Sequence, residues 1–265
     1  MKAYFLLILV ITLLGCNSGA SNNPSNAVTA NDTAANNSAN SVATTIGAQT
    51  VAIDSPDGVK IVGTFLESAK ANSPAVLLLH QWESDRHSYD DFAKRLQAKG
   101  FNVLSIDGRG FGESVKMADG KTVAPERTDA AVKGMLGDVN SAFEFLSKQK
   151  NVDPSRVGIV GASYGSSLAI IYAADNPKVK AVALLSPGLN YFGNMATEPS
   201  VTKYGNRPLL LVAANDDAES ADAVKKLSSA NGKYQVKIYT EGGHGTALFK
   251  VGLEDLLDEF LSKSL

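Results

Sequence analysis

The stretch that decides the fold is RVGIVGASYGSSLAII, residues 156–171. Val157 to Val160 forms an apolar run with the length and composition of a strand buried on both faces. The next five residues, Gly161 to Gly165, follow the pattern G-x-S-x-G, and a helical run comes after them. A sharp turn between strand and helix would hold Ser163 in a strained conformation with its hydroxyl exposed. We therefore predict that Ser163 is a nucleophile; the alternative is a Gly/Ser turn that only connects a strand to a helix.

Short apolar runs alternate with helical patterns through residues 48–265, which indicates parallel strands joined by helices. The predicted strands are 51–53, 59–65, 75–79, 103–106, 157–160, 179–185, 209–212 and 236–239. Asp57-Gly58 predicts a β-hairpin between the first two. The fold class is therefore α/β, with an N-terminal antiparallel hairpin and a doubly wound, mostly parallel sheet. Catalytic groups in such sheets gather at the carboxyl ends of the strands.

Helical spacing predicts a helix over residues 89–96, with Gly100 as its C-cap, and an amphipathic helix over residues 132–146. The last helix is expected to carry one apolar stripe of Phe249, Leu253, Leu256, Leu257, Phe260 and Leu261. Only about twenty residues separate the strand ending at Leu185 from the next strand, which is too few for a helical cap domain. We expect a small loop there and an open, shallow site.

Composition excludes several classes of function. The chain has 265 residues, of which 44% are hydrophobic and 20% charged, enough for one globular core. Its net charge of -2, without a dense basic run, argues against nucleic-acid binding. The sequence has no His-Glu-x-x-His motif, and the glycines of residues 108–112 are not followed by the helix that a dinucleotide site requires. We therefore predict no metal and no cofactor.

Three further stretches accompany the G-x-S-x-G pattern. His80-Gln81-Trp82 follows the strand 75–79, residues 107–114 read DGRGFGES, and residues 153–156 read DPSR just before the strand that leads to Ser163. Together these stretches resemble the α/β-hydrolase superfamily, and within it the dienelactone-hydrolase-like serine esterases, over essentially all of residues 48–265.

The resemblance implies an α/β-hydrolase fold without a large cap domain. It also implies a serine hydrolase that cleaves carboxylic ester, or thioester-like, bonds of a small-molecule substrate through an acyl-enzyme. Two alternatives remain open. One is a peptidase or amidase on the same triad, and the other is a non-catalytic envelope lipoprotein that retains the fold.

The predicted general base is His244, the one histidine of three that follows Ser163. It lies in a glycine-rich segment between the last strand and the last helix, and an imidazole suits proton transfer near neutral pH. The family order of nucleophile, acid and histidine places the acid after the strand 209–212, at Asp216 or Asp217. The family's G-x-x-D turn, with Ala214 in the glycine position, selects Asp217, and Asp216 remains the alternative.

The resemblance also implies the oxyanion hole. One donor would be the backbone N–H of Tyr164, and the other that of Trp82, with Gln81 second. The Trp82 ring either lines the acyl pocket or packs as a partly buried residue. We expect His80 to brace this loop and His87 to be a surface residue.

The first residues predict an envelope location. The apolar run from Ala3 to Leu14 is too short to span a membrane but suits a secretory signal peptide. Leu13-Leu14-Gly15-Cys16 resembles the lipobox of bacterial lipoproteins, with Cys16 as the lipidated residue; an ordinary cleaved signal is the alternative. We expect a signal peptide over residues 1–15, a disordered Asn/Ser/Ala-rich tether over residues 16–47 and the hydrolase domain over residues 48–265. Asn17 favours the outer membrane where the cell has one.

Overall fold

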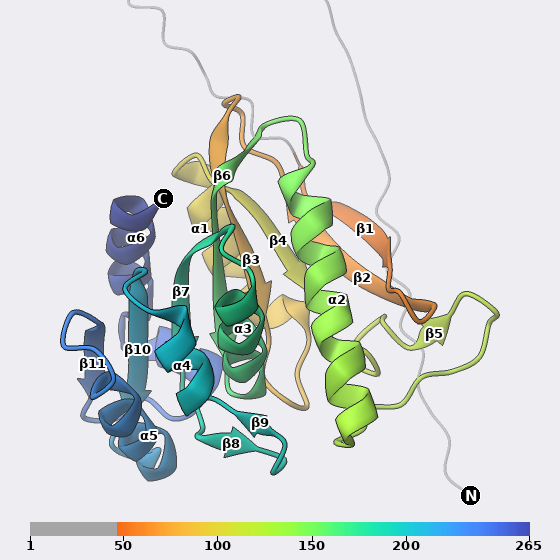
Figure 1. Cartoon of the computed structure of the whole chain (residues 1–265). Coiled ribbons are helices and arrows are strands. Elements are labelled where there is room, and N and C mark those ends of the chain that lie inside the picture. Colours follow the sequence, from red (N-terminus) through yellow and green to blue (C-terminus); the bar gives the residue numbers. More distant parts are fainter. Residues whose placement is uncertain (1–46) are drawn as a thin grey trace, which may run out of the picture. The chain divides into compact units, whose positions relative to one another are not determined.

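The computed structural model describes residues 47–265, and their fold is built around a nine-stranded sheet. The spatial order is β1-β2-β4-β3-β6-β7-β10-β11, with β5 beside β2 (Figure 1). β1 pairs antiparallel with β2, β2 pairs antiparallel with β4, and the strands from β4 to β11 along this order run parallel. The strand bounds are β1 Gln49–Asp54, β2 Val59–Leu66, β3 Ser73–Leu79, β4 Asn102–Ile106, β5 Lys116–Met117, β6 Val152–Ala162, β7 Val179–Leu185, β10 Leu209–Ala214 and β11 Gln235–Tyr239.

This arrangement confirms the predicted fold class. Every predicted strand is present, and the expected hairpin forms between β1 and β2, in register from Gln49 opposite Phe65 to Asp54 opposite Lys60. The predicted signal peptide, Cys16 and nearly all of the predicted tether lie outside the described residues.

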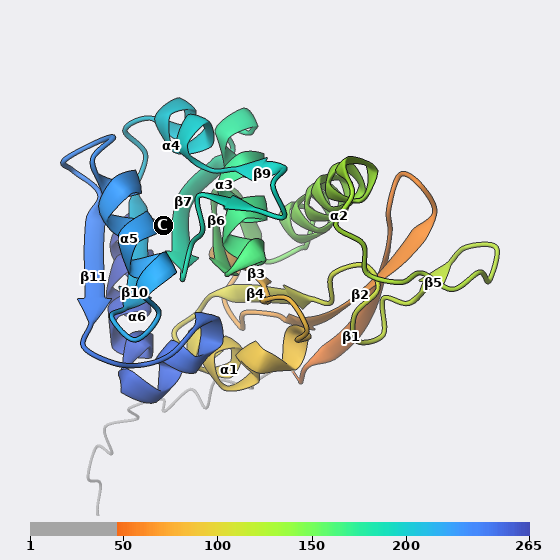
Figure 2. The same ribbon diagram turned by 90° about the horizontal axis from the view of Figure 1, so that it is seen from below.

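Helices cover both faces of the sheet (Figure 2). α2, α3, α4 and α5 contribute to the hydrophobic cluster on one face, whereas α1, the 3₁₀ helix η2 and α6 contribute to the cluster on the other. The bounds are α1 Asp90–Ala98, α2 Asp129–Ser147, α3 Tyr164–Asp175, α4 Glu198–Tyr204, α5 Ala218–Ser228, η2 Gly245–Val251 and α6 Leu253–Ser264. The molecule is therefore a three-layer sandwich with its sheet buried on both sides.

The central strand β3 shows why a continuous apolar run suits this position. Leu77 and Leu79 belong to the cluster under α2 and α3, while Val76 and Leu78 belong to the cluster under α1 and α6. Alternate residues of a strand point to opposite faces, and helices cover both faces of this sheet, so all four side chains are buried.

The prediction of the last helix was wrong in one respect. Phe249 lies in η2, and Gly252, in the left-handed region at φ 83°, separates η2 from α6. Helical spacing of apolar residues continues across this break, so periodicity alone could not detect it. The first predicted helix begins one residue later than expected, because Tyr89 ends the 3₁₀ helix η1 (Arg86–Tyr89).

The connection after β7 is more structured than the loop we expected. It contains a two-stranded hairpin, β8 (Asn190–Tyr191) with β9 (Met195–Ala196), followed by α4. Within residues 47–265 this connection carries no large cap, as the sequence predicted.

Arg109, in the DGRGFGES stretch, ties two distant segments together. Its guanidinium donates to both carboxylate oxygens of Asp138 on α2, at 2.7 and 2.8 Å, and to Asp57 in the turn of the first hairpin at 2.7 Å. Arg109 and Asp138 are both buried. Burial raises the pKa of Asp138, and the hydrogen bonds from Arg109 and Ser55 oppose that rise. Such a pair leaves a costly buried charge when one partner is removed.

We predict that Arg109→Met lowers the free energy of unfolding by about 3–5 kcal/mol at pH 8, because the Asp138 carboxylate loses its bidentate partner. A carboxyl group whose pKa is raised in the folded state destabilises that state above its ordinary pKa, so the loss should shrink as the pH falls to 4. Urea unfolding at both pH values measures the effect. The double variant Arg109→Met/Asp138→Leu should recover part of the loss; equal losses in the single and double variants would contradict this account.

Candidate active site

Ser163 lies at the turn between β6 and α3, where the sequence predicted a strained conformation. Its φ is 54° and its ψ is -122°, unusual values for a residue other than glycine. The Ser163 N–H donates to the carbonyl of Leu185 at 2.8 Å, which ties the turn to the end of β7. The residue as a whole is only 5% exposed. A positive φ held by neighbouring strands is the geometry expected of a nucleophile elbow.

The turn is tight enough to require a glycine at position 161, two residues before Ser163. A Cβ on Gly161 would lie 2.2 Å from the carbonyl oxygen of Gly165, a backbone atom that could not move away without unwinding the start of α3. The G-x-S-x-G pattern is therefore explained by backbone contact.

Asp217 and His244 form a pair at the carboxyl ends of β10 and β11. His244 Nδ1 lies 2.7 Å from Asp217 Oδ2. The Asp217 side chain is mostly buried, at 14% exposed, and the imidazole is 42% exposed. With Nδ1 donating to the carboxylate, the Nε2 atom is left to accept a proton. In residues 47–265 no hydrogen bond joins Ser163 to His244, and catalytic contacts of this kind are often long before substrate binds.

Asp216, the alternative acid, makes different contacts. Its carboxylate accepts from the backbone N–H groups of Gly242 and Gly243, each at 3.1 Å. These two hydrogen bonds lower the pKa of Asp216. The structure thus pairs Asp217 with the imidazole and uses Asp216 to hold the loop that carries His244.

The loop after β3 contains the predicted oxyanion residues Gln81 and Trp82. The backbone N–H groups of Tyr164 and Trp82 take part in no turn, loop or cap hydrogen bond within residues 47–265. The Gln81 side chain instead reaches the loop of His244, accepting from the Thr246 N–H at 2.8 Å and from its hydroxyl at 3.0 Å. Both N–H groups are thus free to donate to another acceptor.

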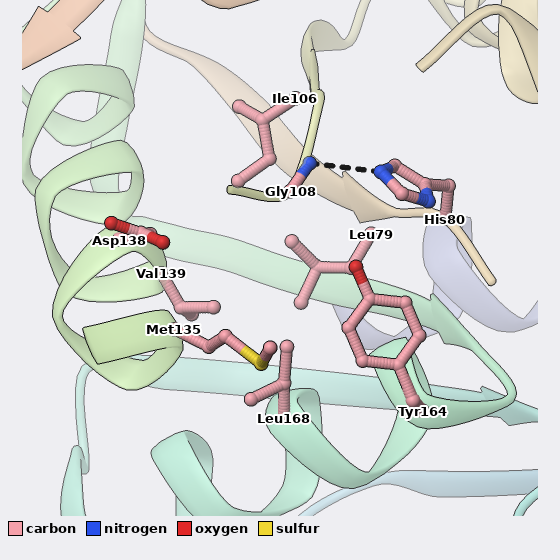
Figure 3. Close-up of a pocket in the computed structure, with 9 residues that line it drawn as sticks. All are labelled: Leu79, His80, Ile106, Gly108, Met135, Asp138, Val139, Tyr164 and Leu168. Atoms are coloured by element: carbon pink, nitrogen blue, oxygen red, sulfur yellow. Dashed lines mark hydrogen bonds between the residues drawn. The ribbon is translucent and has the colours of Figure 1, made fainter. Parts of the chain in front are cut away.

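His80 braces this loop, as the sequence analysis expected. Its Nε2 accepts from the Gly108 N–H at 2.8 Å, so Nδ1 carries the proton and donates to the Gln81 carbonyl at 2.6 Å. Burial lowers the pKa of His80, which keeps the ring neutral. Figure 3 shows this bond beside a cavity of about 20 Å³, into which the hydroxyl of Tyr164 also points.

Residues 61–250 match the family model of the dienelactone hydrolases. The chain belongs to the dienelactone hydrolase family. It is 31% identical over 138 residues to an uncharacterized protein of Mycobacterium tuberculosis strain CDC 1551, a match that covers 52% of this chain and 44% of that protein. The chain thus spans less than half the length of the first curated relatives that it matches.

Solved structures show the same fold. The esterase Pf2001 of Pyrococcus furiosus has a TM-score of 0.65 and 17% identity, with 82% of this chain and 93% of that chain covered. The α/β hydrolase GrgF of Penicillium sp. sh18 has a TM-score of 0.68 and 13% identity, with 83% and 99% covered. These likenesses show that the described residues share the fold of these hydrolases.

The sequence analysis missed two residues of the candidate site. Ser186, which follows β7, is fully buried and accepts from the Gly245 N–H at 2.9 Å. The Tyr191 hydroxyl on the hairpin donates to the Ser186 carbonyl at 3.0 Å. Burial raises the pKa of Tyr191, and hydrogen bonding with the side chains of Ser163 and Ser220 opposes the rise. Tyr191 therefore lies beside the predicted nucleophile.

Trp82 packs in an aromatic cluster. Its ring lies 4.8 Å from that of Phe111, 5.3 Å from that of Tyr164 and 4.8 Å from that of Phe192. The exposed guanidinium of Arg127 lies 4.8 Å from the Trp82 ring centroid and 5.0 Å from that of Phe192. These contacts show that the half-buried ring packs against its neighbours.

The described residues contain no group of three His, Cys, Asp or Glu side chains that could hold a metal ion. Among the same residues no helix is both long and apolar enough to cross a bilayer.

Proposed function

We propose that this chain is a serine hydrolase that cleaves carboxylic ester bonds, with Ser163 as nucleophile, His244 as general base and Asp217 as the acid that orients it. The observation that carries the proposal is the 2.7 Å hydrogen bond between Asp217 and His244 in a structure where Ser163 takes the strained turn conformation. A carboxylate on Nδ1 holds the imidazole in the tautomer that can accept the serine proton at Nε2.

The reaction would proceed in two steps. His244 takes the proton from Ser163 Oγ as this oxygen attacks the ester carbonyl carbon, and the backbone N–H groups of Tyr164 and Trp82 stabilise the resulting oxyanion. His244 then gives the proton to the departing alcohol oxygen, which leaves an acyl-enzyme. In the second step His244 activates a water molecule, which attacks the acyl carbonyl and releases the acid and the free serine.

The location of the enzyme is a separate part of the proposal. We infer from the lipobox-like residues 13–16 that Cys16 is acylated and anchors the chain in a bacterial envelope membrane, the outer one where the cell has two. A diacylated cysteine supplies two chains, and one alone gives only reversible membrane binding.

A fluorophosphonate probe tests the nucleophile directly. The probe should label the 48–265 fragment and should not label its Ser163→Ala variant, because the probe bonds only to an activated serine. Gel fluorescence measures labelling, and Ser262→Ala, at an exposed serine of α6, is the matched control. Equal labelling of the wild-type fragment and Ser163→Ala would remove Ser163 from its role.

Substitution of the two neighbouring aspartates tests which one acts as the acid. Asp217→Asn should lower kcat for a short-chain p-nitrophenyl ester by about 10³–10⁴-fold, because the amide favours the wrong imidazole tautomer. Asp216→Asn should lower it by less than about tenfold, because the amide oxygen can still accept from one of the two glycine N–H groups. The reverse ranking would assign the acid to Asp216.

Metabolic labelling tests the anchor. Cells that express the full chain should incorporate radiolabelled palmitate into it, and Cys16→Ser should abolish the incorporation and move the protein from the membrane to the soluble fraction. Because Cys16 is the only cysteine, no second thiol can replace it. Palmitate incorporation that survives the substitution would rule out this anchor.

A further inference from the structure

A groove of about 520 Å³ lies between residues 188–191 and α5. Figure 1 locates the β8–β9 hairpin and α5, the elements on its two sides. Its hairpin wall includes Leu189, Asn190 and Tyr191, and its helix wall includes Glu219 and Asp222. This volume is within the range of small-molecule sites. The mechanism above uses none of the residues that line it.

The groove meets the site at two points. Tyr191 lines the groove with its ring, while its hydroxyl donates to the carbonyl of Ser186, the residue that follows β7. On the other wall Asp217 is the N-cap residue of α5, so Glu219 in the first turn of α5 lies two residues after the proposed acid. Each wall of the groove therefore includes a residue near the site, Tyr191 beside Ser163 and Glu219 two residues after Asp217.

This position decides which half of an ester the groove would receive. The general acid must be within hydrogen-bond reach of the departing alcohol oxygen, so the alcohol lies on the side of His244. Of the proposed oxyanion donors, Trp82 lies in the loop after β3 and Tyr164 begins α3 directly after Ser163, in the strand order β3-β6-β7-β10. The groove is lined by residues that follow β7 and β10, on the side of Asp217 and away from the loop of Trp82, and this is the side of the alcohol.

The side chains of the groove indicate the chemistry of that alcohol. Glu219 makes no hydrogen bond or ion pair with any residue of the described chain, so its carboxylate is free to accept. The Asn190 Oδ1 atom accepts from the Met195 N–H, which leaves the Asn190 amide group free to donate. The ammonium of Lys226 adds donors and lies 3.5 Å from Glu198 outside the groove. The groove therefore offers both donors and acceptors, together with the half-buried ring of Tyr191.

We infer that this groove binds the alcohol portion of the substrate and selects a neutral, hydroxyl-rich alcohol, such as a sugar unit; the inference rests on the proposed ester hydrolysis. A hydroxyl group both donates and accepts, so a polyol can pair with the carboxylates and with the amide and ammonium groups. The unpaired carboxylate of Glu219 disfavours an anionic alcohol, and the ammonium of Lys226 disfavours a cationic one. The carboxylate of Asp222 is paired with Lys225 at 2.7 Å and keeps one oxygen free to accept. A long apolar alcohol would leave these polar groups without partners.

A series of acetate esters tests the inference, because the acyl group stays constant while the alcohol changes. The esters are vinyl acetate, hexyl acetate, acetylcholine and methyl 6-O-acetyl-glucopyranoside, and a pH-stat measures acetate release from each. The wild-type chain should show a kcat/KM for the glucoside at least about tenfold above that for hexyl acetate, the ratio that corresponds to one or two additional hydrogen bonds. A preference for hexyl acetate or acetylcholine, or no preference, would overturn the inference.

Substitutions in the groove separate recognition from catalysis. Glu219→Leu should lower kcat/KM for the glucoside by about twofold to tenfold and leave that for vinyl acetate unchanged, because the vinyl group is too short to reach Glu219. Glu219→Leu/Asp222→Leu should enlarge the loss. Glu259→Leu, on the exposed face of α6, is the matched control and should change neither rate.

The two proposals fail in different ways. If Glu219→Leu lowered kcat/KM equally for the glucoside and for vinyl acetate, the groove would not be the alcohol site, but the proposed ester hydrolysis would be unaffected. If the wild-type chain hydrolysed none of the four esters, the proposed function itself would be wrong, and the inference would fall with it.

Discussion

The backbone of Ser163 is the constraint on which the rest of the site depends. A residue other than glycine at φ 54° costs about 1–3 kcal/mol. Its N–H donates to Leu185 at 2.8 Å, and its carbonyl accepts from the Ser166 N–H at 2.9 Å and from the Ser166 hydroxyl at 2.6 Å. Each such bond contributes about 0.5–1.5 kcal/mol, so together they offset the strain. One of these bonds comes from the neighbouring strand β7, and the turn is therefore stable only within the completed sheet.

The loop of His244 depends on the sheet in the same way. Gly242, Gly243 and Gly245 have φ values of 154°, 71° and 62°, so this segment has little conformational preference of its own. Three side chains hold it by hydrogen bonds, and each follows the end of a different strand: Gln81 after β3, Ser186 after β7 and Asp216 after β10. A flexible loop is held in place by polar contacts at the edge where parallel strands end, and this explains how residues far apart in sequence are brought to one site.

How well each feature could be predicted from the sequence depends on how far apart in the chain its interacting residues lie. The strand–turn–helix around Ser163 is local, so its pattern was sufficient, and the first hairpin was equally readable from Asp57-Gly58. The pairing of Asp217 with His244 agrees with the register chosen from the family turn, while their catalytic roles stay a prediction. Ser186 and Tyr191 were missed because their contacts join β7, the hairpin and the His244 loop, and no spacing in the sequence encodes such contacts. The position of Ser186 at the carboxyl end of a predicted strand was the one available signal.

The short hairpin after β7 gives the two sides of Ser163 different chemistry. Phe192 packs on Trp82 with Arg127 over both rings, so the surface toward β3 is aromatic and cationic. The adjacent residue, Tyr191, faces the polar groove of α5. Phe192 begins the turn after β8, with φ 60°, and its ring packs on Trp82, so two neighbouring positions can shape two subsites at once. An ester has two unlike halves that meet at the carbonyl carbon, and a divided surface of this kind can recognise each half separately. Under the proposed ester hydrolysis, a hairpin of a few residues thus gives the described part of the chain, which has no large cap, a means of distinguishing the acyl group from the alcohol.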